Sequence, residues 1–256
     1  MKQSIGFVGG GRVTRILLQA FKNENAEFTK IVVTDTNKEV TDKLMKLYPD
    51  IQVDSPTVTA SQDIVFISLH PPVVMDTLDL IKESVKSNAV IVSLAPKITI
   101  AKISSKVNGV KNICRLIPNA TSFINEGYNP VCFSADFLGN KKQEVLGMLS
   151  LAGNTFEVPE EKLESYALIS AMLPTYFWFQ WKELADIGIK LGLTEKESRA
   201  SIHETIIASV NLMFKTDMST ADVMDLIPVK PIGEYESQIS EIYRNKLPAL
   251  FEKIKP

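Results

Sequence analysis

Short runs of β-branched and other apolar residues alternate with helical stretches over the first part of the chain. Several of these runs, such as residues 64–67 and 90–92, are continuously apolar, as in strands that helices cover on both faces. The alternation predicts an α/β fold with a doubly wound, mainly parallel sheet and crossover helices. The expected strands are residues 4–8, 30–34, 63–69, 89–95, 112–118, 130–134 and 154–158.

Helical periodicity replaces this pattern over the rest of the chain. Residues 160–191 carry apolar side chains at helical spacing, and Thr194 followed by Glu197 is typical of a capped helix start. We therefore predict a sheet domain over residues 1–158 and an all-helical domain over residues 159–256, joined by a tight hinge. Two further helices are expected after residues 218–220 and over residues 234–253.

The composition is that of an ordinary globular protein, with 45% apolar residues and with 28 basic against 30 acidic residues. This charge balance gives no sign of a nucleic-acid partner. No apolar run approaches the roughly 20 residues of a membrane span, and no signal peptide precedes the first strand, so we expect a cytoplasmic protein. Cys114 and Cys132 lack metal-ligand spacing, which predicts two reduced core thiols and no metal site.

A glycine-rich segment follows the first predicted strand and precedes a helix. Gly9 and Gly11 occupy the first two positions of a Rossmann fingerprint, where they permit a tight turn and a close approach to a pyrophosphate. The third position is Thr14, which is larger than the usual glycine or alanine. Because the loop lies within a first strand–helix unit of about 30 residues, we still predict a dinucleotide site.

Asp35 follows the second predicted strand, 26 residues after Gly9. An acidic residue at this separation suits a hydrogen bond to a ribose 2′-hydroxyl and would repel a 2′-phosphate. No arginine follows it and the nearest cation is Lys38, so the sequence favours NAD over NADP as the cofactor. In the alternative interpretation, Asp35 caps the helix that begins near Asn37.

Several segments resemble the pyrroline-5-carboxylate reductase family, in order along nearly the whole chain. Pro174 and Tyr176 keep their places in a segment similar to the family's Ser-Gly-Ser-Gly-Pro-Ala-Tyr helix start. The other similar segments are residues 6–11 in the first strand and loop, residues 63–71 in a strand ending before proline, residues 115–119 with the later Glu126 and Gly127, and Gly188 with residues 191–193.

The resemblance implies a Rossmann-type domain followed by a helical domain that intertwines with a twofold mate, as a homodimer or higher oligomer. It also implies reduction of a small carboxylate substrate, a cyclic imine such as pyrroline-5-carboxylate, by NADH or NADPH in proline biosynthesis. Two other functions stay open. One is a dinucleotide-binding protein without turnover, acting as a sensor or interaction module, and the other is a reductase of a keto acid.

Two segments depart from the family's pattern. Ala171, Met172 and Leu173 replace small and hydroxylated residues of the substrate helix. Residues 230–235 keep only Pro231 and one glycine of the family's Ser-Pro-Gly-Gly-x-Thr loop for the substrate carboxylate. We therefore expect the preferred substrate to differ from pyrroline-5-carboxylate, or this compound to be turned over slowly.

Four residues are candidates for the substrate site: Asn119, His70, Tyr176 and Lys230. Asn119 ends the best-matched segment, at the carboxyl end of a strand where ligands of open α/β sheets gather. His70 replaces a lysine of the family and either donates a proton or has a structural or ribose-contacting role. Tyr176 and Lys230 are expected to close the other side, with Lys230 either binding a carboxylate or simply solvated.

The expected cofactor site joins the glycine-rich loop to the ends of later strands. It comprises Gly9, Gly10, Gly11, Arg12, Val13, Asp35, Ser68, Leu69, His70, Pro71 and Ala95. Residues 168–181 carry more large apolar side chains than one helix face can bury within its own domain, which predicts a dimer interface in the C-terminal helices. In the alternative, these side chains pack inside the monomer. His203 is expected on the surface or in that interface.

Overall fold

The computed structural model describes residues 3–107 and 109–256. The chain divides into two compact units, which we call the sheet unit (up to Met172, with Leu250–Pro256) and the helical unit (Leu173–Ala249).

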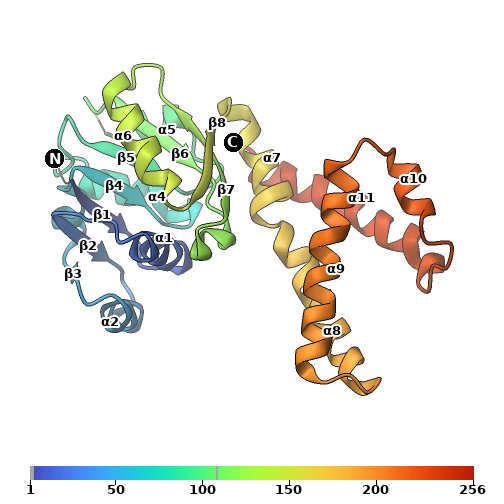
Figure 1. Cartoon of the computed structure of the whole chain (residues 1–256). Helices are drawn as coiled ribbons and strands as arrows, with labels where there is room; N and C mark the ends of the chain where they lie inside the picture. Colours follow the sequence, from blue (N-terminus) through green and yellow to red (C-terminus); the bar gives the residue numbers. More distant parts are fainter. Residues whose placement is uncertain (1–2, 108) are drawn as a thin grey trace. The chain divides into compact units, whose positions relative to one another are not determined.

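One sheet organises the sheet unit, and its described strands follow the order β3-β2-β1-β4-β5-β6-β7-β8 (Figure 1). All neighbouring strands are parallel except β6 and β7. The predicted doubly wound, mainly parallel sheet is confirmed. The strands are β1 (Ser4–Val8), β2 (Lys30–Thr34), β3 (Ile51–Val53), β4 (Ile64–Ile67), β5 (Val90–Ser93), β6 (Asn112–Leu116), β7 (Gly127–Phe133) and β8 (Gly153–Glu157).

The central strands are apolar throughout because their side chains alternate between two cores. Ile64 and Phe66 of β4 pack on one face, where Phe66 stacks on Phe7 with 4.6 Å between ring centroids. Val65 and Ile67 pack on the other face. The helices of the sheet unit are α1 (Arg12–Asn23), α2 (Lys38–Leu47), α3 (Pro56–Ala60), α4 (Pro71–Ile81), α5 (Ile100–Ser104) and α6 (Gly139–Ser150), with the 3-10 helix η1 (Ala120–Ile124).

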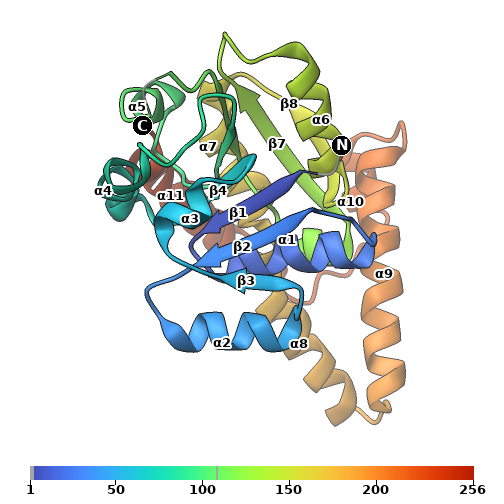
Figure 2. The same ribbon diagram turned by 90° about the vertical axis from the view of Figure 1, so that its left-hand side faces the viewer.

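The edge strand β3 was not among the expected strands. It lies beside β2 at the margin of the sheet (Figure 2). Only Ile51 of its three residues is buried, whereas Gln52 and Val53 are exposed. An edge strand with one buried residue has no continuous apolar run, so the criterion used for the central strands does not detect it.

Two ion pairs of Arg115, one of them buried, connect the residues after the last strand to the sheet. Arg115 of β6 is 1% exposed and donates to Glu160 at 2.9 Å and to Glu164 at 2.5 Å. Leu163 and Ala167 also belong to a small core cluster that includes Ile117 and Cys132. The elements of this segment are the 3-10 helix η2 (Glu160–Lys162), α7 (Leu163–Tyr166) and the π-helix η3 (Ala167–Ala171).

The boundary between the compact units therefore falls after Met172. The sequence pattern changes earlier, at residue 159, because helical periodicity does not reveal which unit a helix packs against. The segment expected as one helical stretch over residues 160–191 is also interrupted, since η3 ends at Ala171 and α8 begins at Leu173. How the two parts divide cofactor and substrate binding stays a prediction.

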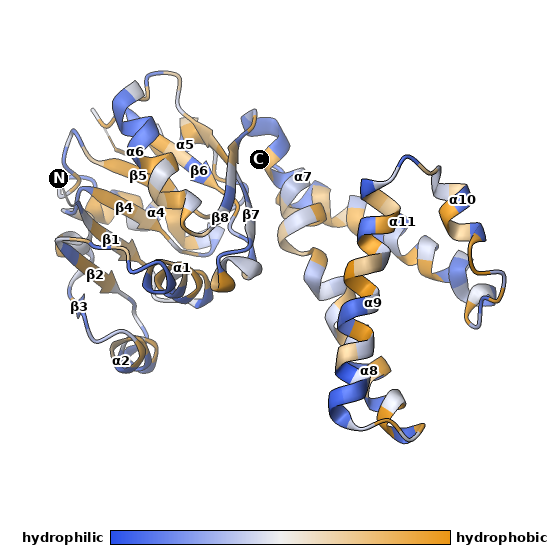
Figure 3. Cartoon of the chain, in the orientation of Figure 1, coloured by the Kyte–Doolittle hydropathy of each residue, from blue (hydrophilic) through white to orange (hydrophobic). Residues whose placement is uncertain are grey.

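The helical unit consists of α8 (Leu173–Lys190), α9 (Glu195–Lys215), α10 (Thr220–Asp225), the 3-10 helix η4 (Gly233–Tyr235) and most of α11 (Glu236–Ile254). The expected cap of α9 is present: the Thr194 side chain accepts from the Glu197 backbone N–H at 3.2 Å, and the Glu197 side chain accepts in return. Ser198 is the only buried residue between positions 173 and 249. Apolar residues are visible along all of these helices (Figure 3).

Candidate functional site

A cavity of about 690 Å³ opens beside the glycine-rich loop and the ends of β4 and β5. It brings together most of the residues that we expected to bind a cofactor. The lining residues are Gly10, Gly11, Arg12, Val13, Arg15, Val40, Lys43, Leu44, Ser68, Leu69, His70, Pro71, Leu94 and Pro96. Ala95 lies between Leu94 and Pro96 in the sequence, but it is buried and does not itself line the cavity.

The glycines of the loop have different reasons to lack a side chain. Gly9 has a φ of +107°, and a Cβ atom there would lie 2.4 Å from the Ser68 carbonyl oxygen, so the turn itself requires glycine. A Cβ atom on Gly11 would have no neighbour within 4 Å. Gly11 therefore keeps space open at the start of α1, where a ligand's phosphates can approach the backbone.

Thr14 fits at the third fingerprint position because its hydroxyl has a partner. The side chain is fully buried and its Oγ1 donates to the Gly9 carbonyl oxygen at 2.6 Å. The residue that weakened the sequence match thus connects the first turn of α1 to the loop.

The N-terminus of α1 has no capping side chain, because its N-cap residue is Gly11. The first N–H groups of a helix have no partner within the helix and carry a partial positive charge. Neither Asp nor Glu occurs in the first turn of α1. The end of this helix is therefore suited to bind an anion.

Asp35 holds the loop against the end of β2. Its Oδ2 accepts from the Gly10 backbone N–H at 2.7 Å, and its Oδ1 accepts from the Asn37 N–H at 2.8 Å. The cap of α2 is Asn37, whose side chain accepts from the Glu39 N–H, so the alternative in which Asp35 caps this helix is wrong. Each carboxylate oxygen retains acceptor capacity for a ribose hydroxyl.

Ser68 contributes a buried hydroxyl that has no hydrogen-bond partner among the described residues. A buried polar atom without a partner costs free energy, and Ser68 lines the cavity. A bound polar ligand would satisfy it. The open space at Gly11, the uncapped α1 and this hydroxyl together fit a dinucleotide.

His70 lies at the N-cap of α4 and is exposed at the cavity wall, with no capping hydrogen bond from its side chain. Several lining residues were not expected. Val40, Lys43 and Leu44 come from α2, where their spacing places them on one helix face. That spacing was visible in the sequence, although only the fold shows that this face meets the glycine-rich loop.

Asn119 is buried and its side chain already has protein partners. Its Nδ2 donates to the Ser170 carbonyl and hydroxyl oxygens, and its Oδ1 accepts from the Thr121 N–H at 3.1 Å. It thereby links the end of β6 to η3, and it is not among the residues that line the cavity. Its expected role in the substrate site stays a prediction.

Tyr176 and Lys230 belong to the helical unit. The ring of Tyr176 lies 6.0 Å from that of Tyr243, and burial, with a contribution from Tyr243, raises the pKa of Tyr176. Lys230 is exposed in the loop before η4. The expectation that these two residues close the substrate site stays a prediction. His203 is exposed beside Glu204, in agreement with a surface position.

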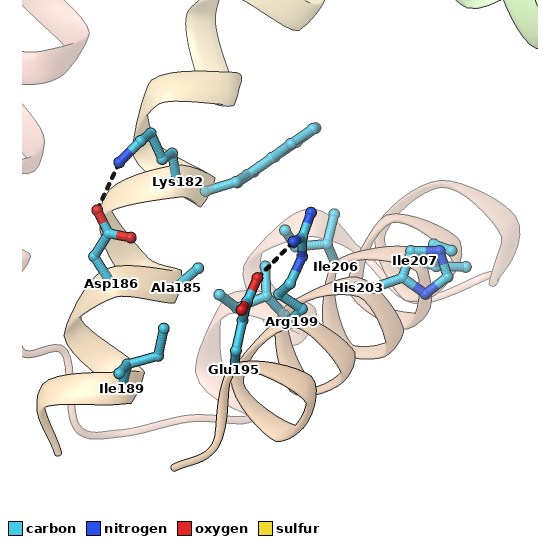
Figure 4. A pocket seen from close by; sticks show the side chains of 11 residues that line it. Lys182, Ala185, Asp186, Ile189, Glu195, Arg199, His203, Ile206 and Ile207 are labelled. Carbon is cyan, nitrogen blue, oxygen red and sulfur yellow. Dashed lines mark hydrogen bonds and ion pairs between the residues drawn. The ribbon is translucent and has the colours of Figure 1, made fainter. Parts of the chain in front are cut away.

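A second cavity, of about 590 Å³, lies between α8 and α9 (Figure 4). Its apolar wall includes Ala185, Ile189 and Ile206, and its charged side chains are paired within each helix. Lys182 contacts Asp186 at 2.7 Å and Arg199 contacts Glu195 at 2.8 Å. Because these charges are paired, this cavity is less suited to phosphates than the first.

Other kinds of site are not supported by the described residues. No three His, Cys, Asp or Glu side chains gather there as a metal site. Cys114 and Cys132 are free and buried, and burial raises the pKa of Cys132 to about 12, as expected for unreactive core thiols. Within the same residues, no helix is both long and apolar enough to cross a membrane.

Comparison with known proteins finds similar proteins over nearly the whole chain. The family described as NADP oxidoreductase, coenzyme F420-dependent, matches residues 4–97. A pyrroline-5-carboxylate reductase from Staphylococcus saprophyticus is 22% identical over 249 residues, which are 96% of this chain and 92% of the relative.

Two solved structures have a similar fold. The Plasmodium falciparum pyrroline carboxylate reductase, solved with NADP bound, has a TM-score of 0.75 and 22% identity, covering 98% of this chain and 94% of that chain. A Coxiella burnetii pyrroline-5-carboxylate reductase has a TM-score of 0.71 and 20% identity, covering 99% and 95%. These similarities confirm the predicted Rossmann-type sheet followed by an all-helical part.

Proposed function

We propose that this chain is a divergent member of the pyrroline-5-carboxylate reductase family. It would reduce the carbon–nitrogen double bond of a small cyclic imine that carries a carboxylate. The observation that carries this proposal is the cavity beside Gly11, with its uncapped helix and the partnerless hydroxyl of Ser68. When bound there, NADH or NADPH supplies the hydride.

The residues of the sheet unit bind and orient the dinucleotide. The N–H groups at the start of α1 hold the pyrophosphate, and Asp35 accepts from a ribose hydroxyl while it keeps the loop in place. Reduction of an imine also requires a proton at nitrogen. His70 is the lining residue with an imidazole, the side chain best suited to proton transfer near neutral pH, and a ribose contact is its alternative role.

The substrate site differs from the family's pattern where it would contact the ring. Ala171 is followed by Met172 and Leu173, and η3 is wound as a π-helix that Asn119 ties to the sheet through Ser170. These larger side chains leave less room and fewer hydrogen-bonding groups than Gly-Ser-Gly. We therefore propose that a cyclic imine other than pyrroline-5-carboxylate is the preferred substrate.

The test is oxidation of NADH and NADPH by the purified chain with a panel of carboxylated cyclic imines and 2-keto acids. We expect turnover with an imine, with pyrroline-5-carboxylate slower than the best one. Turnover of keto acids alone would favour a keto-acid reductase. Dinucleotide binding without any turnover would favour a sensor or interaction module.

Lys230→Met tests the carboxylate contact within the same assay. If Lys230 binds the substrate carboxylate equally in the ground and transition states, KM rises about tenfold while kcat changes less than about twofold. Lys246→Met, which removes another exposed lysine of the helical unit, is the matched control and should behave like the parent. Efficient reduction of pyrroline-5-carboxylate, undiminished in Lys230→Met, would contradict both this contact and the proposed change of substrate.

The helical unit is also proposed to form a homodimer. Of the 29 large apolar side chains that are exposed among the described residues, 20 lie in this unit. Phe214 is 79% exposed and Phe179 is 68% exposed. Because an exposed apolar surface of this extent is uncommon in a monomer, a second copy of the chain is its expected cover. Against the alternative of packing inside the monomer, Leu173, Trp178 and Phe179 of the segment 168–181 are exposed.

Light scattering at micromolar concentration is expected to give twice the 28.4 kDa mass of one chain. Phe214→Glu should shift the population toward monomer, because it places a charge in the apolar surface. Leu80→Glu is the matched control, since Leu80 is exposed on the sheet unit at 61%. A parent protein that is monomeric at this concentration would exclude the proposed dimer.

A further inference from the structure

Three cationic side chains line the cavity of the sheet unit: Arg12, Arg15 and Lys43. None of the described residues that line this cavity is acidic. The pyrophosphate common to NADH and NADPH carries about two negative charges, and a 2′-phosphate adds about 1.5 to 2 more. The cavity therefore offers more positive charge than a pyrophosphate alone requires.

Lys43 belongs to the end of the cavity where the adenosine ribose is expected. A Cβ atom on Gly10 would lie 3.2 Å from side chains of both Val40 and Leu44 and 3.4 Å from the Asp35 Cβ. Val40, Lys43 and Leu44 share one face of α2. Lys43 thus projects from the wall that lies next to Asp35.

The three cationic side chains differ in whether they already interact with other protein groups. The guanidinium of Arg15 lies 5.5 Å from the ring centre of Phe123 and also interacts with Tyr48. Lys38, one helical turn before Lys43 along α2, pairs with Asp42 at 2.7 Å. Neither Lys43 nor Arg12 forms an ion pair with any described residue. These two side chains are available for an anion.

Asp35 is less of an obstacle to a phosphate than its sequence position indicates. Both of its carboxylate oxygens accept backbone N–H groups, from Gly10 and from Asn37. These bonds hold the carboxylate against the loop and offset part of its charge. In the sequence, Asp35 would repel a 2′-phosphate and Lys38 is the nearest cation, whereas the fold adds Lys43 and Arg12.

We propose that Lys43, together with Arg12, binds the 2′-phosphate of the adenosine ribose, so that the protein prefers NADPH to NADH. This inference rests on the proposed dinucleotide function. A lysine ammonium is a compact charge that suits a phosphate, and the guanidinium of Arg12 adds hydrogen bonds in a fixed plane. Lys43 is thereby the residue that distinguishes the two cofactors.

The test measures binding directly, by calorimetric titration of the purified chain with NADPH, NADH, 2′,5′-ADP and 5′-AMP. The parent is expected to bind NADPH and 2′,5′-ADP at least about tenfold more tightly than NADH and 5′-AMP, respectively. Lys43→Met should remove most of this difference. It should weaken the affinity for NADPH and leave the affinity for NADH within about twofold of the parent's. Lys46→Met is the matched control, because Lys46 lies on α2 but does not line the cavity.

The outcomes separate this proposal from the proposed function. Equal affinity of the parent for NADPH and NADH would overturn the assignment of Lys43 and leave the reductase intact. If Lys43→Met lowers the affinity for NADPH and for NADH equally, the assignment is also overturned, since Lys43 would then contact the shared pyrophosphate. If the parent binds none of the four nucleotides, the dinucleotide function itself is excluded, and this inference with it.

Discussion

Gly11→Val is expected to abolish binding of both NADH and NADPH while the protein remains folded. The side chain would enter open space, because no protein atom lies within 4 Å of a Cβ at this position. That space lies beside the first N–H groups of α1, where the pyrophosphate is proposed to bind. A branched side chain there should lower the affinity by more than about 100-fold, which corresponds to about 2.7 kcal/mol.

The measurement is calorimetric titration with each dinucleotide, together with thermal unfolding. Gly147→Val is the matched control, because its Cβ would also meet no atom within 4 Å although it lies on α6 outside the cavity. The control should bind like the parent. Gly9→Ala should instead lower the melting temperature, since Gly9 has a positive φ and no room for a Cβ. Unchanged affinity in Gly11→Val would show that the phosphates bind elsewhere.

The second large effect is expected from Arg115→Met, which should destabilise the sheet unit. The substitution leaves the Glu164 carboxylate buried without its cation, and Glu164 is only 1% exposed. Removing one partner of a buried ion pair costs about 3–5 kcal/mol. Urea unfolding followed by circular dichroism measures the loss. If the free energy of unfolding decreases by less than about 1 kcal/mol, solvent reaches Glu164 in the native protein.

A double variant separates the cost of the unpaired charge from the loss of packing. Arg115→Met with Glu164→Met removes both buried charges and should recover a large part of the stability, because an apolar pair of similar volume often replaces a buried ion pair at little cost. Recovery should be incomplete, since the Lys97 backbone N–H donates to Glu164 at 3.0 Å and would lose this acceptor. The single variant Glu164→Gln retains the acceptor and serves as the comparison.

Local patterns in the sequence determined the class of the fold and the position of the glycine-rich loop. A central parallel strand buries both faces, so it is continuously apolar, and a run such as residues 64–67 can be recognised without knowing its neighbours. Gly9 and Gly11 lie two positions apart in one loop, and α1 begins at the residue that follows Gly11. Such features involve only residues that are close along the chain.

The tertiary structure decided the features that join distant residues. Arg115 keeps η2 and α7 with the sheet through Glu160 and Glu164, which lie 45 and 49 positions later, and no periodicity records that pairing. Asn119 remains a predicted ligand contact, and only the fold shows that its amide also donates to Ser170. The reason is the same in each case: a polar side chain acquires its role from the partner that the fold places beside it, and the partner is not near in sequence.

Lys43 shows the same limit for the cofactor site. In sequence it is one of several lysines on an amphipathic helix, and the nearest cation to Asp35 is Lys38. Only the packing of α2 beside the loop directs Lys43 toward the cavity, while Lys38 pairs with Asp42. The sequence by itself thus predicted a dinucleotide site after β1, whereas the charges around the cavity found there depend on which face of α2 packs against the loop.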